Sequence, residues 1–202
     1  MKKVQKYKIC RRLGPGVFEK CQNTKFVVSE GKHAKNKKNK KPKVLSGYGL
    51  QFIEKQKVRF MYGLSEKQFS NYVKDSVAKK GVSSTEYLFE LLEYRLDNIV
   101  YRLGIASTRR LARQLVSHGH ILVNNKKITV PSMHVRIGDT ISVRPQSSKS
   151  SLFSDMANKL KDYTCPNWLK FNIDSLSGIV EGKPKNVEGF IDLNTVLEFY
   201  SR

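Results

Sequence analysis

The sequence predicts an α+β protein in which several short helices precede a small antiparallel sheet. Two patterns support this class. Between residues 46 and 104, segments with helical apolar spacing begin at capping residues and end at glycines. After residue 120, short apolar runs flank an Asn-Asn pair, which is typical of a tight β-hairpin. A hydrophobic content of 39%, with 10% aromatic residues, is enough to build cores and excludes wholesale disorder.

Positive charge is concentrated at the N-terminus. The 202-residue chain has 38 Lys and Arg against 17 Asp and Glu, a net charge of +21, which favours a polyanionic partner such as nucleic acid. Residues 1–46 hold 15 basic and two acidic side chains. Because residues 32–43 have no apolar periodicity, we expect a flexible basic arm that becomes ordered on its partner. A solvated tail and a localisation signal are the alternatives.

Three short helices are expected between residues 46 and 94. Ser46 can cap the first, which Gly63 ends. A capping box from Ser65 to Gln68 opens the second, which runs to about residue 79, and a further capping box from Ser83 to Glu86 opens the third.

Two further helices should follow. Apolar residues at 96, 99, 100 and 103 form one packing stripe. The next helix, capped by Ser107 or Thr108, places Arg109, Arg110, Arg113 and Ser117 in one sector and its apolar residues opposite. No carboxylate lies three or four residues away on this helix, so its guanidinium groups are suited to phosphate oxygens rather than to a solvated face.

A hairpin with its turn at Asn124-Asn125 and a strand over residues 140–144 predict a small sheet. His118 and His120 precede the hairpin, and no carboxylate or cysteine is close to them in sequence. We therefore expect these histidines to contact nucleic acid rather than to bind metal or to catalyse a reaction.

The cysteines favour neither a disulfide framework nor a metal site. Cys10, Cys21 and Cys165 are an odd number, and we expect reduced thiols. Cys10, Cys21 and His33 could supply three zinc ligands, but their spacing is looser than that of structural zinc sites, so no metal and no cofactor are expected. No segment is apolar enough to cross a bilayer or to act as a secretory signal, which predicts a soluble cytoplasmic protein without a membrane partner.

Three segments resemble the RNA-binding module named after the fourth ribosomal protein of the small subunit. They are Arg95-Leu-Asp-Asn-Ile-Val-Tyr-Arg-Leu-Gly104, Thr108-Arg-Arg-Leu-Ala-Arg-Gln-Leu-Val-Ser-His-Gly119 and His120-Ile-Leu-Val-Asn-Asn-Lys-Lys-Ile128. The module also occurs in pseudouridine synthases, some aminoacyl-tRNA synthetases and ribosome-rescue factors. By itself it implies RNA binding and little else.

The flanking segments resemble the bacterial form of that ribosomal protein itself. They include Tyr48-Gly-Leu-Gln-Phe-Ile-Glu-Lys-Gln-Lys-Val-Arg59 and the closing Val196-Leu-Glu-Phe-Tyr-Ser-Arg202. The charge distribution defines the basic N-terminal arm as residues 1–46. The resemblance implies that a helical domain follows it (47–95, completed by about 180–202). It also implies an inserted RNA-binding module (96–150) and an extension with a return linker (151–179). Four N-terminal cysteines bind zinc in some members, and this chain lacks such a set.

The resemblance implies a structural, non-enzymatic protein of the small ribosomal subunit. Its expected partners are the five-prime domain of small-subunit ribosomal RNA, neighbouring ribosomal proteins and messenger RNA on its path into the subunit, with no small-molecule substrate. It would nucleate assembly of the subunit body. An organelle ribosome is as compatible with the sequence as a cytoplasmic one. The expected RNA contacts are Arg109, Arg110, Arg113, Gln114, Ser117, His118, His120, Arg95, Lys55, Lys57, Arg59, Tyr48, Tyr62, Tyr72, Arg11, Arg12, Lys32 and His33.

Two alternatives and one packing prediction remain. An RNA-modifying or ribosome-associated factor of the pseudouridine-synthase type could carry the same module, although residues 151–202 are too few for its catalytic domain. The charge alone would also permit a DNA-architectural protein. Apolar residues at 190, 193, 196, 197 and 200 predict a final helix that packs near Phe52, Phe60 and Phe89.

Overall fold

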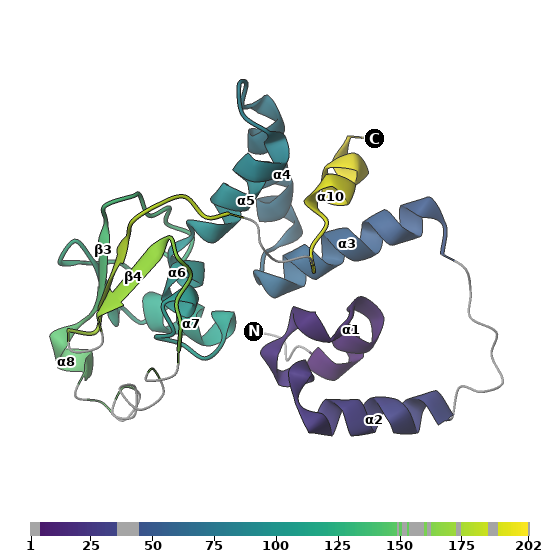
Figure 1. Ribbon diagram of the computed structural model, residues 1–202, viewed down its shortest axis with the longest axis horizontal. Helices are drawn as coiled ribbons and strands as arrows, with labels where there is room; N and C mark the ends of the chain where they lie inside the picture. Colours follow the sequence, from purple (N-terminus) through teal and green to yellow (C-terminus); the bar gives the residue numbers. More distant parts are fainter. Residues whose placement is uncertain are drawn as a thin grey trace. The chain divides into compact units, whose positions relative to one another are not determined.

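The chain forms two compact units, shown in the computed structural model of Figure 1. The structure describes residues 5–35, 45–148, 150, 153, 160, 163–172, 175–185 and 190–201; the side chains of 30–35 are outside this description. Unit 1 comprises Met1–Lys80 and Val187–Arg202, and unit 2 comprises Gly81–Asn186. The predicted α+β class is confirmed, because unit 1 is helical and unit 2 combines helices with an antiparallel sheet.

Three helices form the main part of unit 1: α3 (Gly47–Met61), α4 (Glu66–Ala78) and α10 (Leu193–Tyr200). Their starts follow from local hydrogen bonds. The Ser46 side chain accepts from the Gly49 amide, and the expected capping box joins Ser65 to Gln68. Asp192 accepts from two amides of the first turn of α10. All three helices were expected from the sequence and are confirmed.

Helix α10 lies beside α3 and α4 (Figure 1). The contact is made by aromatic rings. The Phe199 ring centre lies 5.5 Å from that of Tyr48 and 6.2 Å from that of Phe52, and Tyr200 meets Phe69 edge to face at 5.8 Å. Such ring pairs stabilise the packing beyond the apolar area that they bury. Segments more than 120 residues apart therefore share one core.

Of the three expected partners of α10, only Phe52 is confirmed. Phe60 packs instead against Phe18, edge to face at 6.4 Å. Phe18 belongs to the N-terminal layer of unit 1, which residues 5–35 form. Phe89 is buried in unit 2. The spacing of apolar residues indicated which side of α10 is buried but not which residues lie opposite.

The predicted basic arm is wrong for residues 5–35, which are folded. They form α1 (Lys6–Leu13), two short 3₁₀ turns, η1 (Pro15–Val17) and η2 (Glu19–Gln22), and α2 (Thr24–Lys35). A small buried core holds them together. Its apolar residues are interspersed among basic ones along the sequence and come together only where the chain turns at Gly14. Its members are Cys10, Leu13, Val17, Cys21 and Phe26. The rest of the predicted flexible stretch, residues 36–44, lies outside the described residues.

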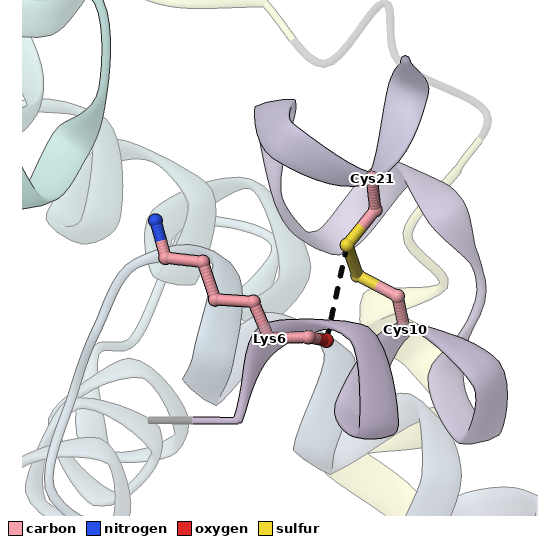
Figure 2. The surroundings of a disulfide bond; sticks show 3 residues. All are labelled: Lys6, Cys10 and Cys21. Atoms are coloured by element: carbon pink, nitrogen blue, oxygen red, sulfur yellow. Dashed lines mark hydrogen bonds between the residues drawn. A yellow bond between two sulfur atoms is a disulfide. The ribbon is translucent and has the colours of Figure 1, made fainter. Parts of the chain in front are cut away.

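A disulfide joins Cys10 to Cys21, contrary to the expected reduced thiols (Figure 2). Cys10 lies on α1 and Cys21 on η2, and both are buried. The turn after α1 folds η2 back onto the helix, so the two sulfurs meet in the core although their spacing in sequence matches no common motif. The Cys21 sulfur also lies 3.8 Å from the carbonyl oxygen of Lys6.

Unit 2 contains α5 (Ser84–Glu93), α6 (Leu96–Arg102), α7 (Arg109–Ser117) and the short α8 (Pro145–Ser148). Its five strands are β1 (Ile121–Val123), β2 (Lys126–Lys127), β3 (Thr140–Val143), β4 (Leu169–Asn172) and β5 (Ser177–Val180). They pair antiparallel in the order β2-β1-β3-β5-β4. The expected turn is confirmed, because Asn124 and Asn125 both adopt positive φ.

Helices α6 and α7 pack through apolar faces that share one core with the sheet. Alternate strand residues contribute to this core, among them Ile121, Val123 and Ile141. Gly178 on β5 admits the side chain of Leu103, and a Cβ at residue 178 would collide with it. Strands β4 and β5, which were not expected, complete the sheet beyond residue 150.

The boundary between the units lies at residues 80 and 81 rather than at 95. Helix α5 belongs to unit 2 because Glu93, near its end, is buried against α6, where it accepts from Asn98 and Arg102. The capping box expected at Ser83 is also wrong: α5 begins there, but the Ser83 side chain makes no capping hydrogen bond.

Candidate nucleic-acid interface

Helix α7 presents a polar face to solvent and an apolar face to the core of unit 2. The Thr108 hydroxyl accepts from the Leu111 amide and fixes the start of the helix, as expected. Ala112, Leu115 and Val116 are buried. The exposed side chains include four predicted RNA contacts, Arg110, Gln114, Ser117 and His118.

Two of the three expected arginines on α7 have partners on α6. Arg113 donates from Nε and Nη2 to Oδ2 of Asp97, at 3.0 and 2.7 Å. Arg109 donates from Nε to Oδ1 of Asn98 at 2.8 Å. The expectation of a face without ion pairs is therefore wrong, because the partners come from the preceding helix rather than from α7 itself. Both arginines remain partly exposed.

The arginines of α7 form a basic face, made by Arg109, Arg110 and Arg113. Lysines of the β1–β2 hairpin extend this face past the end of the helix. Gly119, with φ +74°, ends the helix, and the Lys127 side chain lies across it where a Cβ would collide. Lys126 and Lys127 are both exposed. They are not among the RNA contacts expected from the sequence, although two lysines after a predicted Asn-Asn turn indicate a charged hairpin.

The two histidines have different surroundings. His118 is exposed at the end of α7, whereas His120 is half-buried. The His120 ring packs edge to face on Phe153 at 6.2 Å, and its Nδ1 lies 2.9 Å from the Ser147 hydroxyl. His118 is thus the more accessible of the two predicted contacts.

Arg95 is not available to RNA in this structure. It is 1% exposed and donates from Nε and Nη2 to the carboxylate of Asp97, at 3.0 and 2.8 Å. Its place directly before α6 puts the side chain inside the unit, where an unpaired charge would be costly. The predicted RNA contact is replaced by a buried ion pair.

The basic residues expected on α3 serve mainly the packing of unit 1. Lys55 is 6% exposed and donates to Glu66 at 2.8 Å; its ammonium lies 4.6 Å from the ring centre of Phe199. Lys57 pairs with Glu54 at 2.6 Å. Arg59 donates to Gln56 at 2.9 Å and lies over the Phe60 ring.

Glu66 links α3, α4 and α10. Burial alone would raise the pKa of this carboxyl group, but hydrogen bonds from Lys55 and Tyr200, with the nearby charges of Lys55 and Arg59, lower the pKa below its ordinary value. Burial and the hydrogen bond to Glu66 raise the pKa of the Tyr200 phenol. The pair therefore favours an ionised carboxylate and a neutral phenol.

The three expected tyrosines differ in accessibility. Tyr48 is 54% exposed and stacks on Phe52. Tyr62 is 3% exposed, so its predicted stacking on a base is excluded in this structure. Tyr72 is partly exposed on α4.

The N-terminal candidates lie on α1 and α2. Arg11 donates to the Ser29 hydroxyl at 2.8 Å, and Arg12 is exposed with its guanidinium 5.8 Å from the Phe52 ring centre. Lys32 and His33 lie within α2, and their side chains are outside the described residues. Among the residues that the structure describes, no three His, Cys, Asp or Glu side chains form a group suited to a metal ion.

Comparison with known proteins identifies the family. Residues 95–141 match the S4 domain, and residues 2–93 match the ribosomal protein S4/S9 N-terminal domain. The chain is 43% identical over 201 residues to the small ribosomal subunit protein uS4 of Roseiflexus sp. (strain RS-1), which covers 96% of each chain. This chain belongs to the uS4 family.

Other uS4 proteins match over the same extent. Identity is 40% with the protein of Syntrophomonas wolfei and 41% with that of Aquifex aeolicus, each covering 96% of this chain and 95% of the relative. The S4-domain match spans α6, α7, β1 and β2 and ends within β3, which is the part of unit 2 that carries the basic face. None of the described helices combines the length and apolar character needed to span a bilayer.

Proposed function

We propose that the chain is a structural constituent of the small ribosomal subunit that binds small-subunit ribosomal RNA directly and catalyses no reaction. The match to uS4 proteins over nearly the whole chain is the observation that carries this proposal. The exposed basic face of α7 and the β1–β2 hairpin supplies a surface suited to RNA phosphates. We place this protein in the cytoplasm, within the ribosome.

Binding would proceed by neutralising phosphates where RNA helices converge. Each cation that replaces condensed counterions lowers the repulsion between RNA helices, so the protein favours their junction. Shape recognition suits such a surface better than base reading, because α7 offers mainly phosphate-binding groups. Arg110 leads the proposed contacts because it is exposed at the start of α7; Gln114, Ser117 and His118 follow along the same face, with Arg109 and Arg113 beside them.

We further propose that the RNA site lies in the five-prime domain, that binding nucleates assembly of the subunit body, and that the protein lies near the path by which messenger RNA enters. Neighbouring small-subunit proteins are the expected protein partners. Support comes from the extent of the family match and from the two separate units, each with exposed basic residues that could engage different RNA helices.

The alternative, an RNA-modifying enzyme that carries this module, is not favoured. Such an enzyme needs a catalytic domain besides the module. After residue 150, β4 and β5 complete the sheet of unit 2 and α10 completes unit 1, so the described residues form no third unit.

Sucrose-gradient sedimentation of a cell lysate tests the proposed function. We expect the chain to co-migrate with small subunits, to remain there after a high-salt wash and to be released when magnesium is removed and the RNA unfolds. A chain that sediments with free proteins, or that a high-salt wash removes from intact subunits, would contradict a structural role.

A further inference from the structure

Four arginines in unit 2 are linked by two buried carboxylates and one buried amide. The first chain runs from Arg95 through Asp97 to Arg113, with all N···O distances between 2.7 and 3.0 Å. In the second, Glu93 accepts from Arg102 and from Asn98 Nδ2, and Asn98 Oδ1 accepts from Arg109.

The linking side chains are almost fully enclosed. Asp97, Asn98 and Glu93 are 4%, 1% and 1% exposed. The side chain of Arg113, in contrast, remains 30% exposed. Each chain of contacts therefore begins inside unit 2 and ends at a guanidinium on the outer face of α7.

Asn98 has its orientation fixed by its other partners. Its Nδ2 donates to the backbone carbonyl and to the carboxylate of Glu93, at 3.1 and 2.9 Å. Because an amide nitrogen cannot accept, Oδ1 must face the opposite way, toward Arg109 Nε. The Tyr101 ring supports the same guanidinium from a second side, with its centre 4.4 Å away.

Neither simple attraction of phosphate nor folding alone explains this arrangement. A carboxylate within 3 Å of an arginine reduces its attraction for phosphate, so a face selected only for positive charge would avoid it. Helices α6 and α7 already pack through a shared apolar core, which includes Ile99, Val100, Ala112 and Val116. What the buried acceptors add is a fixed orientation of two long, otherwise rotatable side chains.

We infer that Asp97 and Asn98 are positioning residues for RNA binding, and that they hold Arg113 and Arg109 in the geometry that engages the phosphate backbone before RNA arrives. Side-chain freedom is then lost on folding rather than on binding, and the affinity is correspondingly higher. The inference rests on the proposed function, because it requires that α7 contacts RNA.

The first test measures the arginines without RNA. In the free full-length protein, the Nε–H groups of Arg109 and Arg113 should show the rigid ¹⁵N relaxation of the backbone, while exposed Arg110 should be mobile and serves as the internal control. In Asp97→Asn, the Arg113 signal should become mobile. Mobile Nε–H groups of Arg109 and Arg113 in the unmodified protein would overturn the inference.

The second test measures RNA affinity, which positioning of Arg113 and a simple charge effect predict to change in opposite directions. The probe is small-subunit ribosomal RNA transcribed in vitro, bound to the full chain over a range of salt concentrations. Asp97→Asn removes a negative charge and, by electrostatics alone, should tighten binding. We expect it instead to weaken binding about tenfold, as loss of one charge-assisted contact implies. The salt slope should fall by about 0.7 to 0.9.

Glu181→Gln is the matched control, because Glu181 lies in the same unit with its side chain 50% exposed, and it pairs only loosely with Lys170 at 3.7 Å. This variant should bind RNA at least as tightly as the unmodified chain. In an Arg113→Gln background, Asp97→Asn should cause no further loss, since its effect passes through Arg113. Folded Asp97→Asn protein that binds as tightly as the unmodified chain would overturn the inference.

Asp97→Glu covers the case in which Asp97→Asn does not fold, because it keeps the charge that Arg95 needs and moves only the acceptor. We expect weaker binding and a smaller salt slope with a cooperative thermal transition; unchanged affinity and slope would overturn the inference. Unchanged affinity in the triple Arg109→Gln, Arg110→Gln and Arg113→Gln variant would instead refute the proposed role of α7 itself. If the triple variant binds weakly while the Asp97 variants bind normally, the positioning inference is refuted but the proposed role of α7 is not.

Discussion

Lys55 is a cation that stabilises unit 1 from within. Its ammonium is enclosed by the rings of Phe52, Phe199 and Tyr200 and is hydrogen-bonded to Glu66. Cation–π attraction is strongest where water is excluded. The same charge, placed on the surface, would contribute little to folding.

Removing this ammonium should destabilise unit 1. We expect Lys55→Ala to lower the free energy of unfolding by about 2 kcal/mol, measured by thermal or denaturant unfolding. Lys67→Ala, on the exposed side of α4, is the control and should unfold as the unmodified protein does. An RNA salt slope that falls with no change in stability would show that Lys55 acts at the RNA surface instead.

Arg110 and Arg95 form a matched pair for unit 2. Arg110→Gln, at an exposed position, should weaken RNA binding and leave the melting temperature unchanged. Arg95→Gln leaves the buried carboxylate of Asp97 with one partner fewer and should cost about 3 to 5 kcal/mol of stability. Parallel melting curves and RNA titrations of the two variants check this, and a stable Arg95→Gln protein with weakened RNA binding would reverse the assignment.

Local sequence signals predicted most helices. The elements that depend on contacts between distant residues could not be predicted in this way. Ser46, Thr108 and Gly63 mark helix ends because their hydrogen bonds and backbone angles involve only a few neighbouring residues. The N-terminal layer depends on contacts that form only after the chain turns back at Gly14. Strands β4 and β5 are four residues each. They are specified by the pairing of β5 with β3 and of β4 with β5, which no local pattern reveals.

The general position of the candidate site could be predicted, again because it follows from local sequence. The amphipathic pattern of α7 located its polar face and its exposed Arg110, which depends only on helix geometry. The partners of the other arginines could not be found this way, since Asp97 is 16 residues from Arg113 and on another helix. Burial of Lys55 likewise depends on α10, far along the sequence.

The docking of α10 onto α4 should depend on acid. The pKa of Glu66 is lowered in the folded state, so its contribution to stability is complete above the ordinary value of 4.5 and is lost as pH falls through the folded-state pKa. Hydrogen bonds from Thr195 also lower the pKa of Asp192, which caps α10. Its contribution to stability is therefore likewise lost as the pH falls. Near-ultraviolet circular dichroism should therefore show loss of tyrosine packing below about pH 4.5, and Glu66→Gln should remove part of this acid dependence. A flat signal down to pH 2 would contradict the coupling.

The disulfide should stabilise the N-terminal layer. Cys10 and Cys21 are 11 residues apart, and the chain-entropy relation gives about 3 kcal/mol for such a loop. Dithiothreitol should lower the melting temperature of unit 1, and the double variant Cys10→Ser and Cys21→Ser should not respond to it. Cys165→Ser, which changes a thiol in unit 2, is the control and should respond as the unmodified chain does. Equal melting of oxidised and reduced protein would exclude a stabilising bond.

At the scale of the whole molecule, the two units have separate cores and should lose structure separately. Deleting residues 190–202 removes large apolar side chains of α10 from unit 1, at roughly 1.5 to 3 kcal/mol for each that was fully buried. That sum is comparable with the stability of a small domain. Calorimetry of the truncated chain should show loss of the transition of unit 1 and retention of that of unit 2. A melting profile matching the full chain would show that α10 does not complete unit 1.

The distant pairing of α3 with α10 has a consequence for biosynthesis. Translation produces the rings of Tyr48 and Phe52 early, but Phe199, which covers them, only after all of unit 2. At about 5 to 20 residues per second, the roughly 145 residues between Phe52 and Phe199 take about 7 to 29 seconds. Throughout that interval the nascent chain presents an uncovered aromatic surface beside a highly cationic segment. Aggregation and chaperone capture therefore compete with folding during synthesis, and slowing translation between codons 81 and 192 would prolong that competition without altering the finished protein.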